Sequence, residues 1–159
     1  MFLALMLYWI ILMVSRIEAV REARTWLDTP FHHQASIKGV GCDCIGLIKG
    51  VGVALYLVDY DPASSQAKAF ANYSMMPNPR RMREGLATWL VPIAVDDALP
   101  ADILFMTWGR EPQHVALKTD KGIIHSYSGV GKVVEHALDE NWQRRVVAAY
   151  RYPSLVGVE

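Results

Sequence analysis

The order of two hydrophobic patterns along the chain is the strongest constraint on its fold. Before Pro92, apolar residues recur at helical spacing, whereas short β-prone runs separated by turn residues follow it. The predicted strands cover residues 102–108, 114–119, 122–127, 132–137 and 144–150. Turn signals at this spacing are typical of an antiparallel meander. We therefore predict an α+β domain in which N-terminal helices pack on one face of an antiparallel sheet of about five strands.

Helices are predicted in the first half of the chain. They cover residues 16–27, 44–57 and 79–90, and a further short helix is a candidate over 63–72. Ser15, Asp43 and Asn78 precede the three longer segments and are residue types that cap helix N-termini. The segment that follows Asp43 is apolar nearly all round, which is typical of a buried, central helix.

Residues 1–14 form an uncharged, apolar segment that we separate from a domain over 15–159. A bilayer-spanning helix needs about 17–25 apolar residues, so this segment is short for a membrane span. A signal peptide begins with positive charge, but the first charge here, Arg16, follows the apolar run. Three interpretations stay open: contact with a membrane, packing on the domain or on a partner protein, or an extension ahead of a true start such as Met13.

Charge and cysteine content restrict the partners and the redox chemistry. The chain has 16 Lys and Arg against 16 Asp and Glu, so its net charge is zero and no nucleic-acid partner is expected. Its two cysteines, Cys42 and Cys44, are separated by one residue, and a disulfide between them would close a strained ring. Zinc sites favour cysteines with wider spacing. We expect reduced thiols, no metal and no other cofactor.

The run GVGCDCIGL at residues 39–47 contains both cysteines and predicts a nucleophile. Cys44 opens the apolar helix, where unpaired backbone N–H groups and the positive end of the helix dipole favour the thiolate. His114 and His125 lie in predicted neighbouring strands, and a hairpin would place both imidazoles on one face of the sheet. We expect Cys44 to attack, His114 to act as the base, and His125 to hold the ring and tautomer of His114.

Several short motifs occur in order along the chain: WLDTPF at 26–31, DCIGL at 43–47, ADIL at 101–104, HVAL at 114–117 and IIH at 123–125. This ordered set resembles the NlpC-type superfamily of papain-like cell-wall peptidases. The GVGCDCIGL run and WQRRVVAAYRYP at 142–153 resemble, more specifically, the branch found in phage and gene-transfer-agent tails. The resemblance implies a papain-like fold with Cys44 as nucleophile, His114 as base and His125 as the third polar residue.

The chain departs from the family beside the nucleophile. The family often has Tyr where Phe31 stands, and its hydroxyl is thought to line the active site. Its absence leaves an oxyanion donor either missing or supplied by His32 or His33, while Asp43 is a structural cap with a secondary effect on the site. Ile45 replaces the common small polar residue after the nucleophile, and we expect its side chain in the core.

By resemblance, the substrate is the stem peptide of bacterial peptidoglycan, and the bond cleaved is the γ-D-glutamyl–diamino-acid amide. The protein would be made in the bacterial cytoplasm and act at the cell wall as part of a phage-like tail, beside tail structural proteins. Two alternatives stay open: an amidase or acyltransferase on the same scaffold, and an inactive structural or wall-binding tail component. The missing tyrosine at position 31 favours inactivity, whereas the complete cysteine and histidine set favours an enzyme.

Further roles are assigned to residues from their type alone. Asp43 or Asp102 is a candidate to bind an amine of the substrate, and Arg80, Arg81 or Arg110 to bind its carboxylate. Aromatic residues such as Trp108 and Trp142 are expected in the core rather than in a glycan groove. His136 stands at a strand end and is expected on the surface.

Overall fold

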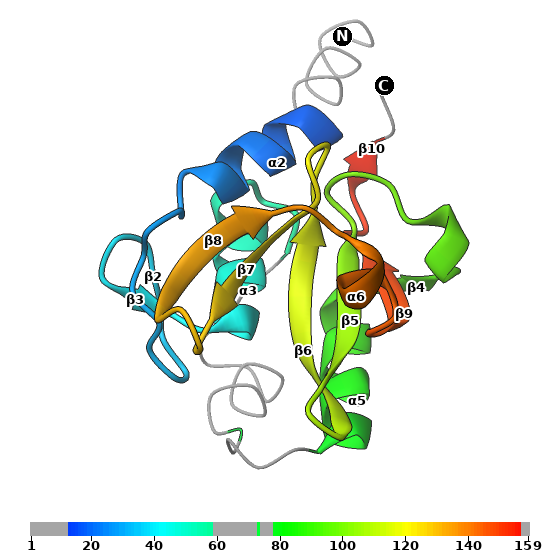
Figure 1. Ribbon diagram of the computed structural model, residues 1–159. Helices are drawn as coiled ribbons and strands as arrows, with labels where there is room; N and C mark the ends of the chain where they lie inside the picture. Colours follow the sequence, from blue (N-terminus) through cyan, green and yellow to red (C-terminus); the bar gives the residue numbers. More distant parts are fainter. Residues whose placement is uncertain (1–12, 59–72, 74–77, 157–159) are drawn as a thin grey trace, which may run out of the picture.

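A six-stranded antiparallel sheet organises the fold in the computed structural model, which describes residues 13–58, 73 and 78–156 (Figure 1). Its strands are β4 (Val91–Ile93), β5 (Ile103–Trp108), β6 (Glu111–Lys118), β7 (Ile123–Tyr127), β8 (Lys132–His136) and β9 (Val146–Arg151). They lie side by side in the order β4-β9-β5-β6-β7-β8. The predicted α+β class and antiparallel sheet are confirmed, and the candidate helix over 63–72 lies outside the described residues.

The sheet has one strand more than predicted. Strands β5 to β8 form the expected meander, and β9 returns to pair with β5. The additional strand, β4, pairs with β9 at the edge of the sheet and contains Pro92, which lies opposite Tyr150. Proline donates no backbone hydrogen bond and is tolerated in edge strands, so its presence hid a strand in the sequence.

Each predicted helix start is confirmed. The helices are α2 (Arg16–Arg24), α3 (Cys44–Ala54) and α5 (Pro79–Trp89). Ser15 and Glu18 form a reciprocal capping box at α2, in which the Glu18 carboxylate accepts from the Ser15 N–H at 2.8 Å. Asp43 Oδ1 accepts from the Gly46 N–H at 2.8 Å, and Asn78 Oδ1 accepts from the Arg81 N–H at 2.9 Å. Local capping chemistry therefore sets all three starts.

The first two helices end earlier than predicted, for different local reasons. After α2, Trp26 bonds to the carbonyl three residues back, which is the tighter 3₁₀ pattern. After α3, Tyr56 adopts a left-handed backbone with φ of +55°, and the N–H groups of Leu57 and Val58 both bond to the Gly52 carbonyl. This reversal folds Leu57 and Val58 into the core instead of extending the helix.

Two hydrophobic layers lie on opposite faces of the sheet. Helices α2, α3 and α5 pack on one face, where Phe105, Val115 and Ile124 point toward them. The short helix α6 (Glu140–Gln143) covers the other face through Trp142 (Figure 1). Small parallel and antiparallel ribbons complete the fold: β1 (Val14–Ser15) with β10 (Leu155–Val156), and β2 (Ser36–Ile37) with β3 (Gly41–Cys42).

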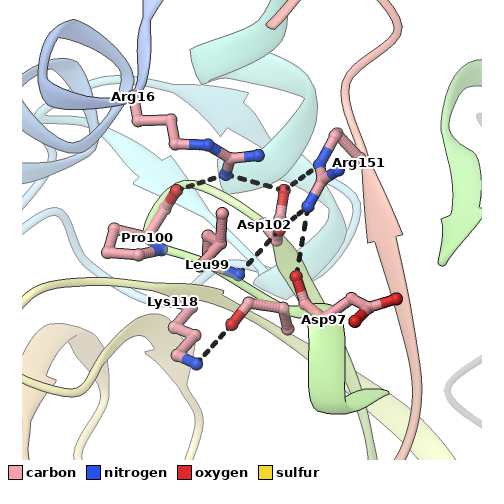
Figure 2. Close-up of polar contacts among 8 residues, drawn as sticks. Arg16, Asp97, Leu99, Pro100, Asp102, Lys118 and Arg151 are labelled. Atoms are coloured by element: carbon pink, nitrogen blue, oxygen red, sulfur yellow. Dashed lines mark hydrogen bonds and ion pairs between the residues drawn. The ribbon is translucent and has the colours of Figure 1, made fainter. Parts of the chain in front are cut away.

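A buried carboxylate ties the start of α2 to the sheet. Asp102 is fully buried, and Figure 2 shows the guanidinium groups of Arg16 and Arg151 converging on it. Arg16 Nη1 lies 3.0 Å from Asp102 Oδ1, Arg151 Nη2 lies 2.7 Å from Oδ2, and the Leu99 N–H donates to Oδ2 at 2.8 Å. The suggestion that Asp102 binds a substrate amine is therefore wrong, because its oxygens are occupied in the interior.

The Asp102 cluster predicts a specific loss of stability. Asp102→Ala leaves two guanidinium groups without their shared partner, so we expect the free energy of unfolding to fall by about 3–5 kcal/mol. Urea unfolding followed by tryptophan fluorescence measures this. The control is Glu84→Ala, which removes an ion pair with Arg80 whose side chains are both exposed, and it should leave unfolding almost unchanged. Equal effects of the two substitutions would contradict the structural role of Asp102.

Candidate active site

Cys44 lies at the first turn of α3, where the sheet opens. Strands β6 and β7 pair at two positions only, and beyond Leu117 and Ile124 they separate (Figure 1). The backbone amide of Val115, on the separated part of β6, lies against the Cys44 thiol. On the other side, Ser126 Oγ of β7 donates at 2.7 Å to the carbonyl of Cys42, the last residue of β3. The opening therefore receives the N-terminus of α3 between the two strands.

The two histidines meet across the same opening. His114 on β6 and His125 on β7 are both buried, and His114 Nε2 lies 2.7 Å from His125 Nδ1. The expected juxtaposition of the imidazoles is therefore observed. Within the described residues no hydrogen bond joins His114 to Cys44, although the thiol contacts the backbone of the next residue, Val115. Catalytic hydrogen bonds are often loose before substrate binds, so this arrangement is compatible with proton transfer.

Burial controls the protonation of the thiol. It raises the pKa of Cys44 to about 12, and the neighbouring Asp43 carboxylate adds to this increase. The backbone amides of Val115 and Ile45 act in the opposite direction but are weaker. The N–H groups at the start of the helix favour the thiolate, as expected, but theirs is the smaller effect. Desolvation outweighs the helix-end effect, and the thiol carries its proton at neutral pH.

The imidazoles are also neutral. Burial, assisted by the positive charge of Arg145, lowers the pKa of His114 to about 4. Burial, followed by the proximity of His114 and His136, lowers the pKa of His125 to about 2. The thiol and the two histidines are therefore neutral at pH 7, so attack by the sulfur would require its proton to move to an acceptor such as an imidazole.

Asp43 fixes the loop that precedes α3. One carboxylate oxygen caps the helix, and the other accepts from the Gln34 N–H at 2.7 Å and from the Tyr73 hydroxyl. His33 Nδ1 lies 3.5 Å from the same oxygen, and its ring meets the Tyr73 ring edge-on at 5.2 Å. Tyr73 was not anticipated, because it lies in a stretch of sequence without helix or strand periodicity. It brings a hydroxyl group close to the residue before Cys44.

The other two residues expected to support the site lie differently. Phe31 forms a parallel backbone bridge with Cys42, so it positions the chain just before the nucleophile. His32 is exposed, and its Nδ1 lies 3.1 Å from the carbonyl of His33. Of the two loop histidines, the structure therefore places His33 against Asp43 and leaves His32 at the surface.

A layer of aromatic side chains covers the histidines on the side of α6. Trp142 lies 5.1 Å from His125 and perpendicular to it, and Trp108 lies 5.0 Å from His114, measured between ring centroids. The Arg145 guanidinium sits 5.3 Å from the Trp108 ring and 5.2 Å from the Trp142 ring. Trp142 packs against the second hydrophobic layer, as expected of a core residue, and both tryptophans also cover the two histidines.

His136 lies beside the other two histidines. It was expected on the surface, but its ring is half-buried and its Nε2 lies 2.9 Å from His125 Nε2. The spacing did contain a signal: His136 on β8 lies opposite Ile123, two residues from His125 on the same face of β7. Residues at such diagonal positions of neighbouring strands are within reach of each other.

Neither a metal centre nor a membrane span is found in the part of the chain that the structure describes. No group of three His, Cys, Asp or Glu residues there is arranged to hold a metal ion. No helix in residues 13–58 and 78–156 has the length and apolar character needed to cross a bilayer.

The fold matches that of NlpC/p60 domains. The NlpC/p60 domain of the peptidoglycan hydrolase SagA superposes with a TM-score of 0.60 and 19% identity, covering 86% of this chain and 98% of that domain. An NlpC/P60 family protein from Bacillus cereus gives 0.59 and 16%, over 88% of this chain but 41% of that protein. The P60 domain of an antigen from M. avium subspecies paratuberculosis gives 0.51 and 17%, over 86% and 93%.

Comparison of sequences alone gives no match. Neither a family model nor a curated protein matches the chain. The likeness to NlpC/p60 domains therefore rests on the arrangement of helices and strands, and it establishes the fold.

The raised pKa of Cys44 predicts how fast the thiol is alkylated at different pH values. In a Cys42→Ala variant, the rate of iodoacetamide alkylation should increase continuously with pH up to about pH 10, because the reactive thiolate forms only near a pKa of about 12. Mass spectrometry of the intact protein measures the rate. A constant rate between about pH 6 and pH 9 would instead reveal a thiolate–imidazolium pair and contradict the neutral resting state.

Proposed function

We propose that this protein is a cysteine endopeptidase that cleaves stem peptides of bacterial peptidoglycan. The observation that carries the proposal is the placement of Cys44, at the N-terminus of a buried helix, beside strand β6, whose His114 is hydrogen-bonded to His125 of strand β7. The NlpC/p60 fold supports it, since the similar domain of SagA belongs to a peptidoglycan hydrolase.

The chemistry follows from the neutral state of the groups. Cys44 Sγ attacks the amide carbonyl carbon while its proton passes to His114, and the backbone N–H of Cys44 with a neighbouring N–H stabilises the oxyanion. His114 then gives the proton to the leaving amine as the C–N bond breaks. Water then attacks the carbonyl carbon of the resulting thioester and gives a proton to His114, which returns it to the Cys44 sulfur as the C–S bond breaks. His125 orients the His114 ring throughout.

Substrate and setting follow from the family resemblance. The bond is the γ-D-glutamyl–diamino-acid amide, and the setting is a phage-like tail that acts at the cell wall beside tail structural proteins. The Asp43 network supports activity, because it holds His33 and the Tyr73 hydroxyl beside the residue that precedes Cys44, where Phe31 itself has no hydroxyl to offer. Such groups are candidates for the oxyanion or substrate contact that a tyrosine at position 31 would make.

Defined muropeptides test the reaction. The expected products are fragments ending in L-Ala-γ-D-Glu and peptides beginning with the diamino acid, identified by mass spectrometry. Release of intact stem peptides from glycan would identify an N-acetylmuramoyl amidase, and transfer to an added amine would identify an acyltransferase. Absence of turnover on every muropeptide would support the inactive structural alternative and contradict the proposal.

Substitutions test the assignment of the nucleophile. Cys44→Ala should lower kcat/KM by at least about four orders of magnitude, and adding His114→Ala should cause no further loss, because the two residues act as a unit. His125→Ala should leave residual activity, since it orients the base and does not react. The matched control is Cys42→Ala, two residues away and also a thiol, which should keep most activity. Loss of activity in the control with Cys44 intact would overturn the assignment.

A further inference from the structure

Three imidazoles form a continuous row that ends on a backbone carbonyl. His114 Nε2 lies 2.7 Å from His125 Nδ1, and His125 Nε2 lies 2.9 Å from His136 Nε2. The remaining nitrogen of His136, Nδ1, lies 2.8 Å from the carbonyl oxygen of Ala137. The row thus crosses β6, β7 and β8 and contains no carboxylate.

The Ala137 carbonyl determines which nitrogen of each ring carries a proton. A carbonyl oxygen only accepts, so His136 Nδ1 must be the donor. In the neutral form of His136 this is its one N–H, so Nε2 accepts from His125 Nε2–H. His125 Nδ1 then accepts from His114 Nε2–H. The unprotonated nitrogen of His114 is therefore Nδ1, which is free to take a proton.

His125 alone is not sufficient to impose this arrangement. An Asp or Asn oxygen at position 125 would accept a hydrogen bond from His114 Nε2–H and so fix the tautomer of His114. A neutral histidine at position 125 can either donate to His114 or accept from it, through either nitrogen. With the opposite tautomer, His125 Nδ1–H would donate to His114 Nε2, and the proton on His114 Nδ1 would block the base. A further acceptor beyond His125 is needed to exclude that state.

We propose that His136 is a positioning residue. Because the Ala137 carbonyl can only accept a hydrogen bond, it fixes the tautomer of His136, which fixes that of His125 and leaves His114 Nδ1 unprotonated to act as the base. The inference rests on the proposed function for its catalytic consequence, but the tautomers themselves are independent of activity. Trp142 maintains the geometry, because its ring lies 4.6 Å from His136 and 5.1 Å from His125.

A pair of variants separates the acceptor from the shape of the side chain. His136→Phe keeps an aromatic ring against Trp142 but removes the acceptor, whereas His136→Gln keeps an oxygen able to accept from His125 Nε2–H. We expect kcat on muropeptides to fall about tenfold in His136→Phe with KM unchanged, and to stay within about threefold in His136→Gln. Equal losses in both variants, or a change in KM alone, would overturn the positioning role.

Nitrogen-15 NMR of the imidazoles provides the readout that does not need turnover. In the unmodified full chain, His125 and His114 should each be protonated at Nε2, and His136 at Nδ1. In His136→Phe, His125 should become a mixture of tautomers, while His136→Gln should retain the original pattern. A His125 protonated at Nδ1 in the unmodified protein would overturn the inference. The expected tautomers without cleavage of any muropeptide would leave it standing and reject the proposed function instead.

Discussion

The separation of β6 and β7 is the constraint on which the site depends. Backbone pairing between them stops at Leu117 and Ile124, and the N-terminus of α3 enters the space that the strands leave. Side chains replace the missing backbone bonds, since the pair His114 and His125 spans the opening at 2.7 Å. A fully paired hairpin would exclude the thiol, so the loss of sheet pairing is the condition for bringing Cys44 to the histidines.

Desolvation then decides how such a site works. The His114 and His125 rings are buried and Cys44 is half-buried, so desolvation disfavours the charged forms, and the pKa values of Cys44 and His114 move apart to about 12 and about 4. In the proposed reaction, charge separation would therefore begin only as the sulfur attacks, beside the backbone amides that lie against the thiol. The Asp43 carboxylate caps α3 with one oxygen and binds the preceding loop with the other, and its charge adds to the increase in the pKa of Cys44.

Local chemistry made much of this fold predictable from the sequence. The caps at Ser15, Asp43 and Asn78 act over one helical turn, so they can be predicted from neighbouring residues. The turn residues between the β-prone runs likewise predict the meander. The failures concern interactions across the fold. Tyr73 reaches Asp43 from an aperiodic stretch, and His136 reaches His125 from a neighbouring strand. The protonation state of Cys44 could not be predicted for the same reason, since desolvation depends on every group packed around the thiol.

The end of the histidine row on a main-chain carbonyl has an evolutionary consequence. Every amino acid at position 137 supplies the same oxygen, so the acceptor that His136 contacts leaves no trace in residue identity. Drift at position 137 would be silent, whereas positions 125 and 136 would be expected to change together, for instance when an Asn or Asp at 125 makes a second ring unnecessary. A search for site residues by identity alone would therefore recover the three rings and overlook the carbonyl oxygen that His136 contacts.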